Sequence, residues 1–481
     1  MVLLMRAPAV PSLRTRVLSL LGNWNRADVG VLALGLLGAG NLWARRGAGN
    51  AFHDAWPAAF LGGFAMVAAA GLLCLFAVRR SSGMPSRVAC AASIAVQLFP
   101  VPAYVMPLPW RCVTAVLLGA VPWIRRSRMA WVPVGLAACI VASATISSWS
   151  WGSAIIDVFH EVQGSTLALI QGHNPYTPVY SIYLDSPLHH VAYGSASFNY
   201  GPAVVLLSVP ARLLGDVRLT LVVLNIAILV AALIWLRRAR PGQDFGPTVA
   251  ALWVASPFIP LMILNAWTDV FCFAGLAWWL VLRDKHRNWS IAFLAVALAS
   301  KPTTLPLMVP MLFWVRSTWR ELLWATFGAL LIVAPFALWT GVPQFVYDTI
   351  TIFGDLPARR DSVSLDGVST VLGHGILSSS WLLLGALASV AVFTLRRPRD
   401  YGDLLVAGAG TLIVVCFFAK QAFLNYDYNA AMALLFVIGA GSLRPSTALS
   451  NPLGGLRQAV RRRPGAQRLG APATDPERSP I

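Results

Sequence analysis

The sequence predicts an all-α polytopic membrane protein, and three observations carry that prediction. The chain of 481 residues is 57% hydrophobic and only 12% charged, against about 25% charged residues in an ordinary globular domain. Its hydrophobic residues form long runs, which cross a bilayer as helices. Its basic residues lie in short clusters between those runs, as in cytoplasmic loops. These observations exclude a water-soluble globular enzyme, a disordered chain and a disulfide-stapled secreted domain.

The hydrophobic runs predict about 13–14 transmembrane helices in a membrane domain over 29–442. The candidate spans are 29–44, 58–78, 88–105, 111–124, 131–150, 217–236, 248–265, 268–282, 289–300, 304–315, 321–340, 374–395, 403–419 and 427–442. We place the N-terminal tail, 1–28, in the cytoplasm and let the chain change sides of the membrane after each span. Every basic cluster then lies on the cytoplasmic side except Arg45–Arg46 and Arg359–Arg360. This parity holds only if 201–215 does not cross, so we expect that segment to be re-entrant or to lie on the surface.

The net charge of +18 does not indicate nucleic-acid binding, because the basic residues are dispersed among the predicted inner loops. The segment 443–481, rich in Arg, Pro, Gly and Ala, predicts a disordered basic cytoplasmic tail near anionic lipid. The six cysteines form no CxxC pair, so neither a zinc site nor a redox motif is indicated. We therefore expect no metal and no cofactor.

Two predicted outer loops are long, at about 151–200 and 341–373, and the first holds the densest polar cluster. Its members are Asp157, His160, Glu161, Gln163, Gly172, His173, Asn174, Pro175 and Tyr176. Asp157, His160 and Glu161 stand at i, i+3 and i+4, so they share one face if 157–171 forms an interfacial helix. Gly172 is a typical helix end, and Asn174 with the following proline predicts a turn.

Asp157 has two interpretations. It is an N-cap carboxylate of the interfacial helix, or it is a general base whose partial burial makes it more basic. A metal site formed by Asp157, His160 and Glu161 is a weaker alternative, because such neighbours are common on surface helices.

Three sequence motifs together resemble the C-type membrane glycosyltransferases, in particular the actinobacterial family that uses polyprenyl-phosphate mannose. The motifs are Asp157 with Gly172, Asn174-Pro175-Tyr176 and Tyr200-Gly201-Pro202; Ser256-Pro257 with Asn265-Ala266-Trp267-Thr268-Asp269; and Ala299-Ser300-Lys301-Pro302 with Pro306 and Pro310. The second motif resembles an Asn-Gly-Gln-x-Asp stretch of that family, and the third its lysine-containing, proline-rich segment. The resemblance spans about residues 150–440.

The resemblance implies a multi-pass cell-membrane enzyme with its active site on the outer face. The implied donor is a polyprenyl-phosphate sugar, with mannose first and arabinose second, and the implied acceptor is a glycolipid or cell-envelope glycan. Two features depart from the family pattern. Five predicted spans precede Asp157 instead of one, which makes Asp54 in the first outer loop a rival base, and Ala266 stands in place of the family glycine.

Inverting sugar transfer from a lipid phosphate requires a base for the acceptor hydroxyl and cations that stabilise the departing phosphate. The base is predicted to be Asp157. The predicted donor-phosphate ligands are Lys301, Arg359, Arg360 and Lys420. The predicted substrate-binding residues are His160, Glu161, His173, Asn174, Tyr176, Tyr200 and Asp269. The lysines could instead be interfacial anchors, the two arginines solvated loop charges, and Asp269 a helix N-cap.

A transporter or flippase for a lipid-linked substrate is the main alternative function. Such a protein places charged groups near the bilayer midplane on broken helices. Here the predicted spans carry almost no charge, and the polar residues gather at one surface, which favours surface chemistry. A non-catalytic assembly or sensor protein is the third possibility, and it leaves the convergence of acidic and basic residues unexplained.

Overall fold

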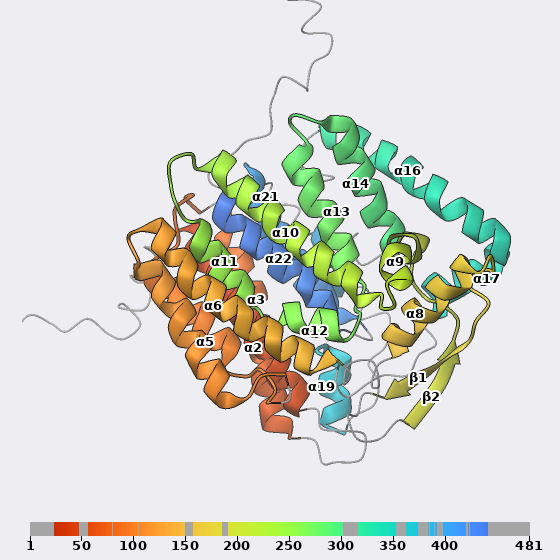
Figure 1. The fold of residues 1–481 in the computed structure, drawn as a ribbon, viewed down its shortest axis with the longest axis horizontal. Helices are drawn as coiled ribbons and strands as arrows, with labels where there is room; N and C mark the ends of the chain where they lie inside the picture. The colour runs from red at the N-terminus through yellow and green to blue at the C-terminus, as the bar shows by residue number, and fades with distance from the viewer. Residues whose placement is uncertain are drawn as a thin grey trace, which may run out of the picture. The chain divides into compact units, whose positions relative to one another are not determined.

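The computed structural model describes most of the hydrophobic part of the chain (Figure 1). The described residues are 24–47, 56–78, 80–103, 105–149, 157–184, 191–301, 316–352, 362–373, 383, 385–388, 390–391, 398–419, 422 and 424–440. The predicted C-terminal tail, most of the N-terminal tail, the span at 304–315 and most of the span at 374–395 lie outside them.

Helices correspond to all the other predicted spans. In chain order they and the connecting elements are α2 (Arg26–Gly47), α3 (Pro57–Ala77), α4 (Arg87–Leu98), α5 (Leu108–Ala120), η1 (Val121–Trp123), α6 (Ser127–Ser147), α8 (Asp157–Ile170), β1 (Tyr180–Leu184), β2 (Val191–Ala196), α9 (Pro202–Leu213), α10 (Arg218–Ala239), α11 (Gly246–Ala255), α12 (Phe258–Leu264), α13 (Asp269–Leu282), α14 (Arg287–Ser300), α16 (Arg316–Thr340), α17 (Val342–Val346), the π-helical turn η2 (Tyr347–Thr351), α19 (Leu365–Val371), α21 (Tyr401–Phe418) and α22 (Leu424–Ala440). The prediction of a helical, polytopic membrane protein is confirmed.

Fewer helices than predicted are long enough to cross a membrane alone. Among the described residues six helices meet that criterion, and a seventh span results if α11 and α12, bent by 52° at Ser256–Pro257, are counted together. Several others, such as α4 with 12 residues and α13 and α14 with 14 each, fall short of the roughly 20 residues that a span needs. The segment 201–215 contains α9, whose 12 residues are likewise too few to cross.

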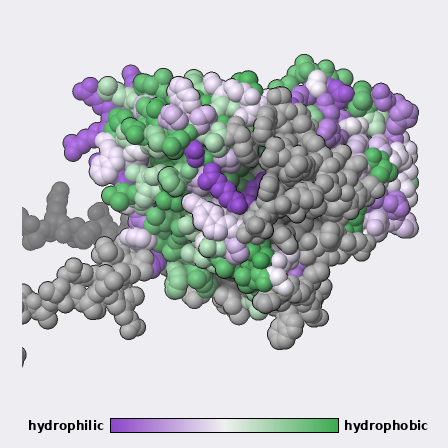
Figure 2. All heavy atoms as spheres, turned by 90° about the horizontal axis from the view of Figure 1, so that it is seen from below, coloured by the Kyte–Doolittle hydropathy of each residue, from purple (hydrophilic) through white to green (hydrophobic). Residues whose placement is uncertain are grey.

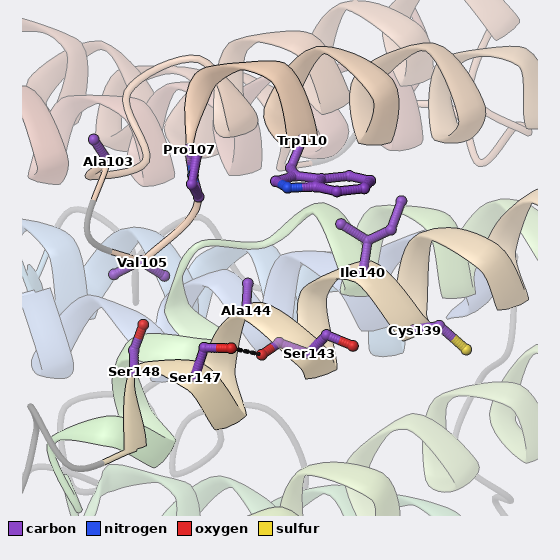
Figure 3. Close-up of a pocket in the computed structure, with 10 residues that line it drawn as sticks. All are labelled: Ala103, Val105, Pro107, Trp110, Cys139, Ile140, Ser143, Ala144, Ser147 and Ser148. Carbon is purple, nitrogen blue, oxygen red and sulfur yellow. Dashed lines mark hydrogen bonds between the residues drawn. The ribbon is translucent and has the colours of Figure 1, made fainter.

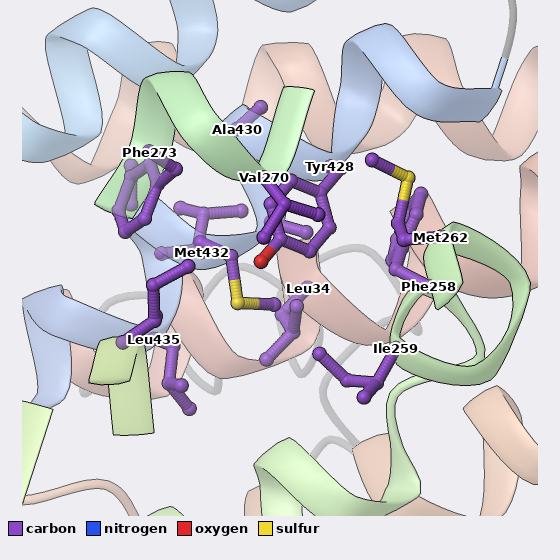
Figure 4. Packing of buried hydrophobic residues seen from close by; sticks show 14 of the residues in the cluster. Leu34, Phe258, Ile259, Met262, Val270, Phe273, Tyr428, Ala430, Met432 and Leu435 are labelled. Atoms are coloured by element: carbon purple, nitrogen blue, oxygen red, sulfur yellow. The ribbon is translucent and has the colours of Figure 1, made fainter. Parts of the chain in front are cut away.

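The core of the bundle surrounds α22, which is buried on all sides (Figures 1 and 4). Leu34 of α2, Phe258 of α12, and Phe273 of α13 pack around Tyr428 and its neighbours on α22. A helix that is hydrophobic all round is covered either by other parts of the protein or by lipid, and here the neighbouring helices cover it. By contrast, α6 and α16 expose most of their apolar surface, as expected of helices that face lipid.

The first described helix is part of this core and not an appendage. α2 packs against α3, α4 and α22, and its contact with α3 is very close. A Cβ atom on Gly40 would lie 2.7 Å from the carbonyl oxygen of Gly63. Small residues allow membrane helices to approach to this extent. The helices that precede α8 therefore belong to the same packed bundle as the rest.

Buried ion pairs hold one end of the bundle, where α13 turns into α14. Glu321 of α16 accepts a hydrogen bond from Arg283 at 2.8 Å and from the indole of Trp279 at 3.2 Å. Its other carboxylate oxygen lies 3.6 Å from Arg287. At the same predicted inner side, Arg26 pairs with Asp400 and Asp403. We call this the Arg283 end of the bundle; the opposite end carries α8.

The loop predicted to hold an interfacial helix contains a helix at the predicted position, and it also contains a hairpin that was not predicted. α8 begins at Asp157 and ends before Gly172, whose φ of +78° lets the chain turn so that the amide of His173 bonds to the carbonyl of Ala168 at 2.8 Å. Farther on, β1 and β2 pair as an antiparallel hairpin. The alternating β-branched and aromatic residues of Tyr-Ser-Ile-Tyr-Leu favour that conformation.

Candidate active site

The first turn of α8 presents two carboxylates to the same side of the helix. Asp157 is half-buried, and its Oδ1 accepts a hydrogen bond from the amide of Val158 at 2.8 Å. Glu161, one turn later, is 1% exposed, and among the described residues its Oε2 has no hydrogen-bond partner. His160 is exposed. The predicted shared face therefore consists of the two acids, with His160 at its edge.

The environment of Glu161 favours its protonated form. Burial raises the pKa of Glu161 well above its ordinary value, the neighbouring charge of Asp157 raises it further, and a backbone hydrogen bond from Asn199 opposes both effects. A protonated Glu161 can donate a hydrogen bond and places no negative charge beside Asp157. The two acids of α8 are thus suited to different tasks.

We expect Glu161→Gln to change how stability depends on pH. Because the pKa of Glu161 is higher in the folded protein than in the unfolded chain, the free energy of unfolding falls as pH rises above the unfolded value of about 4.3, by up to about 1.4 kcal/mol per pH unit until the folded pKa is reached. Glutamine resembles the protonated acid and does not titrate. Thermal unfolding in detergent is measured from pH 4 to 8. As pH rises, the unfolding temperature of the variant should increase relative to that of the unsubstituted protein. Parallel pH profiles would show that the pKa of Glu161 is not raised by folding.

Tyr200 links α8 to the membrane-embedded part of the site. Its backbone carbonyl accepts a hydrogen bond from the hydroxyl of Tyr176 at 2.8 Å, and its ring centroid lies 5.4 Å from Nζ of Lys301. Burial raises the pKa of Tyr200, and the negative charges of Glu161, Asp157 and Asp269 add to the rise. The Tyr200 ring is therefore within electrostatic reach of both α8 acids and of α13.

The residue after Tyr200 must be glycine, because its backbone lies directly against the end of α14. The amide of Gly201 donates a hydrogen bond to the carbonyl of Ser300 at 2.9 Å. A Cβ atom at this position would lie 2.0 Å from the carbonyl oxygen of Ala299, which no side chain can tolerate. The Tyr-Gly-Pro sequence thus fixes Tyr200 directly against the end of α14, where Lys301 begins the next segment.

Lys301 and Asp269 form a buried ion pair. Nζ of Lys301 lies 2.9 Å from Oδ2 of Asp269, with side-chain exposures of 5% and 0%. Asn425 donates to the same oxygen at 2.8 Å, and the ring centroid of Tyr426 lies 4.5 Å from the ammonium group. The predicted phosphate ligand Lys301 and the predicted substrate ligand Asp269 therefore bind each other, so the net charge of the pair is near zero.

The lengths of α13 and α14 bear on the depth of the ion pair in a membrane. α13 begins at Asp269 and ends at the Arg283 end, α14 runs back from that end to the residue before Lys301, and both have 14 residues, about 21 Å of helix. The hydrocarbon core is about 30 Å thick. With the Arg283 end at one boundary of the hydrocarbon, we expect the pair to lie several ångströms short of the opposite boundary.

The turn before Asp269 is strained. Ala266 lies between α12 and α13 with φ of +51°, and it is the non-glycine residue with positive φ among the described residues. This left-handed conformation costs an L-residue roughly 1–2 kcal/mol and is natural for glycine. In the motif that this stretch resembles, the corresponding residue is glycine, which adopts positive φ without this cost.

We expect Ala266→Gly to be tolerated far better than a glycine elsewhere in the same core. The loss of a buried methyl group is offset at Ala266 by the release of roughly 1–2 kcal/mol of backbone strain. Ala277→Gly in α13, equally buried at 0% exposure, has no such compensation and also loses about 1 kcal/mol of helix propensity. In thermal unfolding, Ala266→Gly should have a clearly higher unfolding temperature than Ala277→Gly. Equal destabilisation of the two variants would show that the turn is unstrained.

The Asn174-Pro175-Tyr176 turn has a structural role. Oδ1 of Asn174 accepts a hydrogen bond from the amide of Tyr176 at 2.9 Å, and its Nδ2 donates to Thr340 of α16 at 3.1 Å. Tyr176 is 2% exposed and packs edge-on against Phe198 and other rings. These two predicted substrate ligands hold α8 against α16, whereas His173 is exposed after the helix.

The sequence-based list omitted one cation that the structure places against Trp267, in the turn before Asp269. The guanidinium of Arg45, in the last turn of α2, lies 5.7 Å from the ring centroid of Trp267, two residues before Asp269. Arg45 and Arg46 violate the predicted inside location of basic clusters, and that exception was the available signal. On the lower side of the protein in Figure 1, hydrophilic residues surround a hollow (Figure 2).

The remaining predicted residues can be placed as follows. Arg359, Arg360, Lys420 and the rival base Asp54 lie outside the described residues. Within the part of the chain that the structure describes, no three His, Cys, Asp or Glu side chains are grouped closely enough to hold a metal ion. Asp157, His160 and Glu161, the alternative metal site, do not form such a group.

Comparison with known proteins gives one match. Residues 198–424 match the sequence model of glycosyltransferase family 87, a stretch that begins just before Tyr200 and includes Asp269 and Lys301. No curated protein and no solved structure matched the chain. Together with the membrane-spanning helices, the match supports a C-type membrane glycosyltransferase.

Proposed function

We propose that the protein transfers a sugar from a polyprenyl-phosphate donor to a hydroxyl group of a glycolipid or cell-envelope glycan, with inversion, at the outer face of the cell membrane. Mannose is the first candidate sugar and arabinose the second. The observation that carries the proposal is the position of Tyr200, which lies within electrostatic reach of the α8 acids and against the Lys301–Asp269 pair. These contacts support a site in which the α8 acids and the Lys301–Asp269 pair act on one substrate.

In the proposed reaction Asp157 is the general base. It accepts the proton of the acceptor hydroxyl while that oxygen forms a bond to the anomeric carbon of the sugar. The bond between this carbon and the phosphate oxygen breaks on the opposite side, and its electron pair remains on the phosphate. The lipid phosphate is a stable leaving group, so no general acid is required. One carboxylate and a cationic environment are sufficient.

The proposed phosphate ligands are Lys301, Arg359, Arg360 and Lys420. Lys301 shares its charge with Asp269, so it can contribute directed N–H groups more readily than net positive charge. Arg45 at the end of α2 adds a cation against Trp267, in the turn before Asp269, and a guanidinium binds phosphate oxygens in bidentate fashion. His160, Glu161, His173 and Tyr200 are proposed to contact the sugar or acceptor.

The expected depth of the ion pair supports a lipid-linked donor. The phosphate of a membrane lipid lies near the boundary of the hydrocarbon, and the sugar chemistry must take place close to it. A site that stops short of this boundary is reached by a lipid entering sideways from the bilayer. A water-soluble nucleotide sugar has no such requirement.

A transfer assay tests the proposal. Membranes that contain the protein are given radiolabelled polyprenyl-phosphate mannose or polyprenyl-phosphate arabinose together with envelope glycolipids. Formation of a labelled glycoside by right-side-out vesicles, dependent on the protein, is the expected result. Movement of labelled lipid between leaflets without a new glycosidic bond would support the flippase instead, and labelling only in inside-out vesicles would overturn the proposed orientation.

A further inference from the structure

A groove lies between α5, α6 and the segment that precedes α5 (Figure 3). Its volume is about 680 Å³, which is within the range of sites that hold one ligand of moderate size. The residues that line it are Ala103, Val105, Pro107, Trp110, Cys139, Ile140, Ser143, Ala144, Ser147 and Ser148. Trp110 and Ile140 face each other across it, and three serines gather toward the end of α6.

The apolar part of this groove opens toward lipid. α6 qualifies as a membrane span, yet only 22% of its apolar window is buried within the protein. Val132, Leu136 and Ile146 on the same helix are 61%, 54% and 68% exposed. An apolar hollow at this depth is in contact with hydrocarbon chains and not with water, because the bilayer is the solvent there.

The polar end of the groove leads to the helix that carries Asp157. Directly after Ser148, the indole of Trp149 donates a hydrogen bond to Asp216 at 2.8 Å. Arg218, which is also paired with Asp216, donates to the carbonyl of Trp149. Its guanidinium lies 4.3 Å from the ring centroid of Trp149 and 4.7 Å from that of Phe159 on α8. One buried arginine thus joins the end of the groove to the first turn of α8.

We propose that this groove binds the polyprenyl chain of the donor lipid, with the chain along Trp110 and Ile140 and its phosphate end toward the serines and α8. The inference rests on the proposed function, which supplies a donor of this class. The groove ends beside the helix that carries Asp157, which favours the donor lipid as occupant over a bulk membrane lipid. The helices before α8 then have a role in the reaction, because they guide the donor to the site.

Two native cysteines provide a direct binding test without any substitution. Cys139 and Cys112 are both exposed, the other four cysteines are buried, and of the exposed pair only Cys139 lines the groove. In detergent at pH 8, sugar-free polyprenyl phosphate should slow alkylation of Cys139 by N-ethylmaleimide several-fold and leave Cys112 unchanged, as read by mass spectrometry. Equal protection by phosphatidylglycerol, or protection of both cysteines, would overturn the assignment of the occupant.

Groove-filling variants give a second, functional readout. Ser143→Phe and Ala103→Phe place a ring in the groove from opposite walls, and we expect each to raise the KM for the donor about tenfold with kcat nearly unchanged. Val132→Phe, on the exposed lipid-facing surface of α6, is the matched control. If both filling variants transfer sugar with an unaltered KM, the groove does not bind the donor chain, but the proposed transferase function still holds. Protection of Cys139 without any transfer would support the groove and remove the proposed reaction.

Discussion

Asp157→Asn is expected to reduce sugar transfer by about 10²- to 10⁴-fold, the usual contribution of a positioned general base. Asparagine keeps the size of the side chain and its carbonyl oxygen, so it can still accept the hydrogen bond from the amide of Val158. It cannot accept the proton of the acceptor hydroxyl. The protein should therefore insert and unfold normally while kcat collapses. The measurement is the initial rate of glycoside formation at equal amounts of purified protein.

Two control variants make this result specific. Gln171→Ala changes an exposed residue directly after the same helix and should leave the rate within a few-fold of the unsubstituted value. Asp54→Asn removes the rival base in the first predicted outer loop and should also be active. If the Asp157→Asn protein is active, or the Asp54→Asn protein is inactive, Asp157 is not the general base.

Breaking the Lys301–Asp269 pair from either side is expected to destabilise the protein by about 3–5 kcal/mol, because the remaining partner is a buried charge without its counterion. Lys301→Met leaves Asp269 at 0% exposure, and Asp269→Asn leaves Lys301 at 5%. Asn425 can compensate only in part, since it donates a single hydrogen bond to Asp269. The measurement is thermal unfolding in detergent together with the yield of folded protein.

The double variant Lys301→Met, Asp269→Leu separates stability from function. Apolar residues of similar volume often replace a buried pair at no cost, so we expect stability to return while transfer remains absent. A stable double variant with full activity would show that the pair only clamps α13 to α14. Arg399→Ala is the control. Arg399 is 51% exposed, and its buried partner Asp403 keeps Arg26 as a second counterion, so we expect a loss of at most about 1 kcal/mol.

The local features of this protein were predictable because they depend on nearby sequence. Hydrophobic runs specify helices wherever water is absent, and α8 begins at Asp157 and ends before Gly172 as its spacing and glycine predicted. The short hairpin after α8 was missed, because the pairing of β1 with β2 depends on residues brought together across a loop. A hydrophobic run does not reveal where its helix ends, so the sequence did not predict that α13 and α14 have only 14 residues each beside Asp269 and Lys301.

The sequence by itself determined the class of fold and which residues are chemically capable, since composition and helical spacing act over a few residues. Only the tertiary structure decided which of these residues are in contact. It joined Lys301 to Asp269, set Tyr200 against the ammonium group, and brought Arg45 of the first described helix to Trp267. It also made Asn174 and Tyr176 supports of α8. These contacts arise from the packing of helices that are distant in the sequence. The residue pattern within one helix does not specify which other helix it packs against.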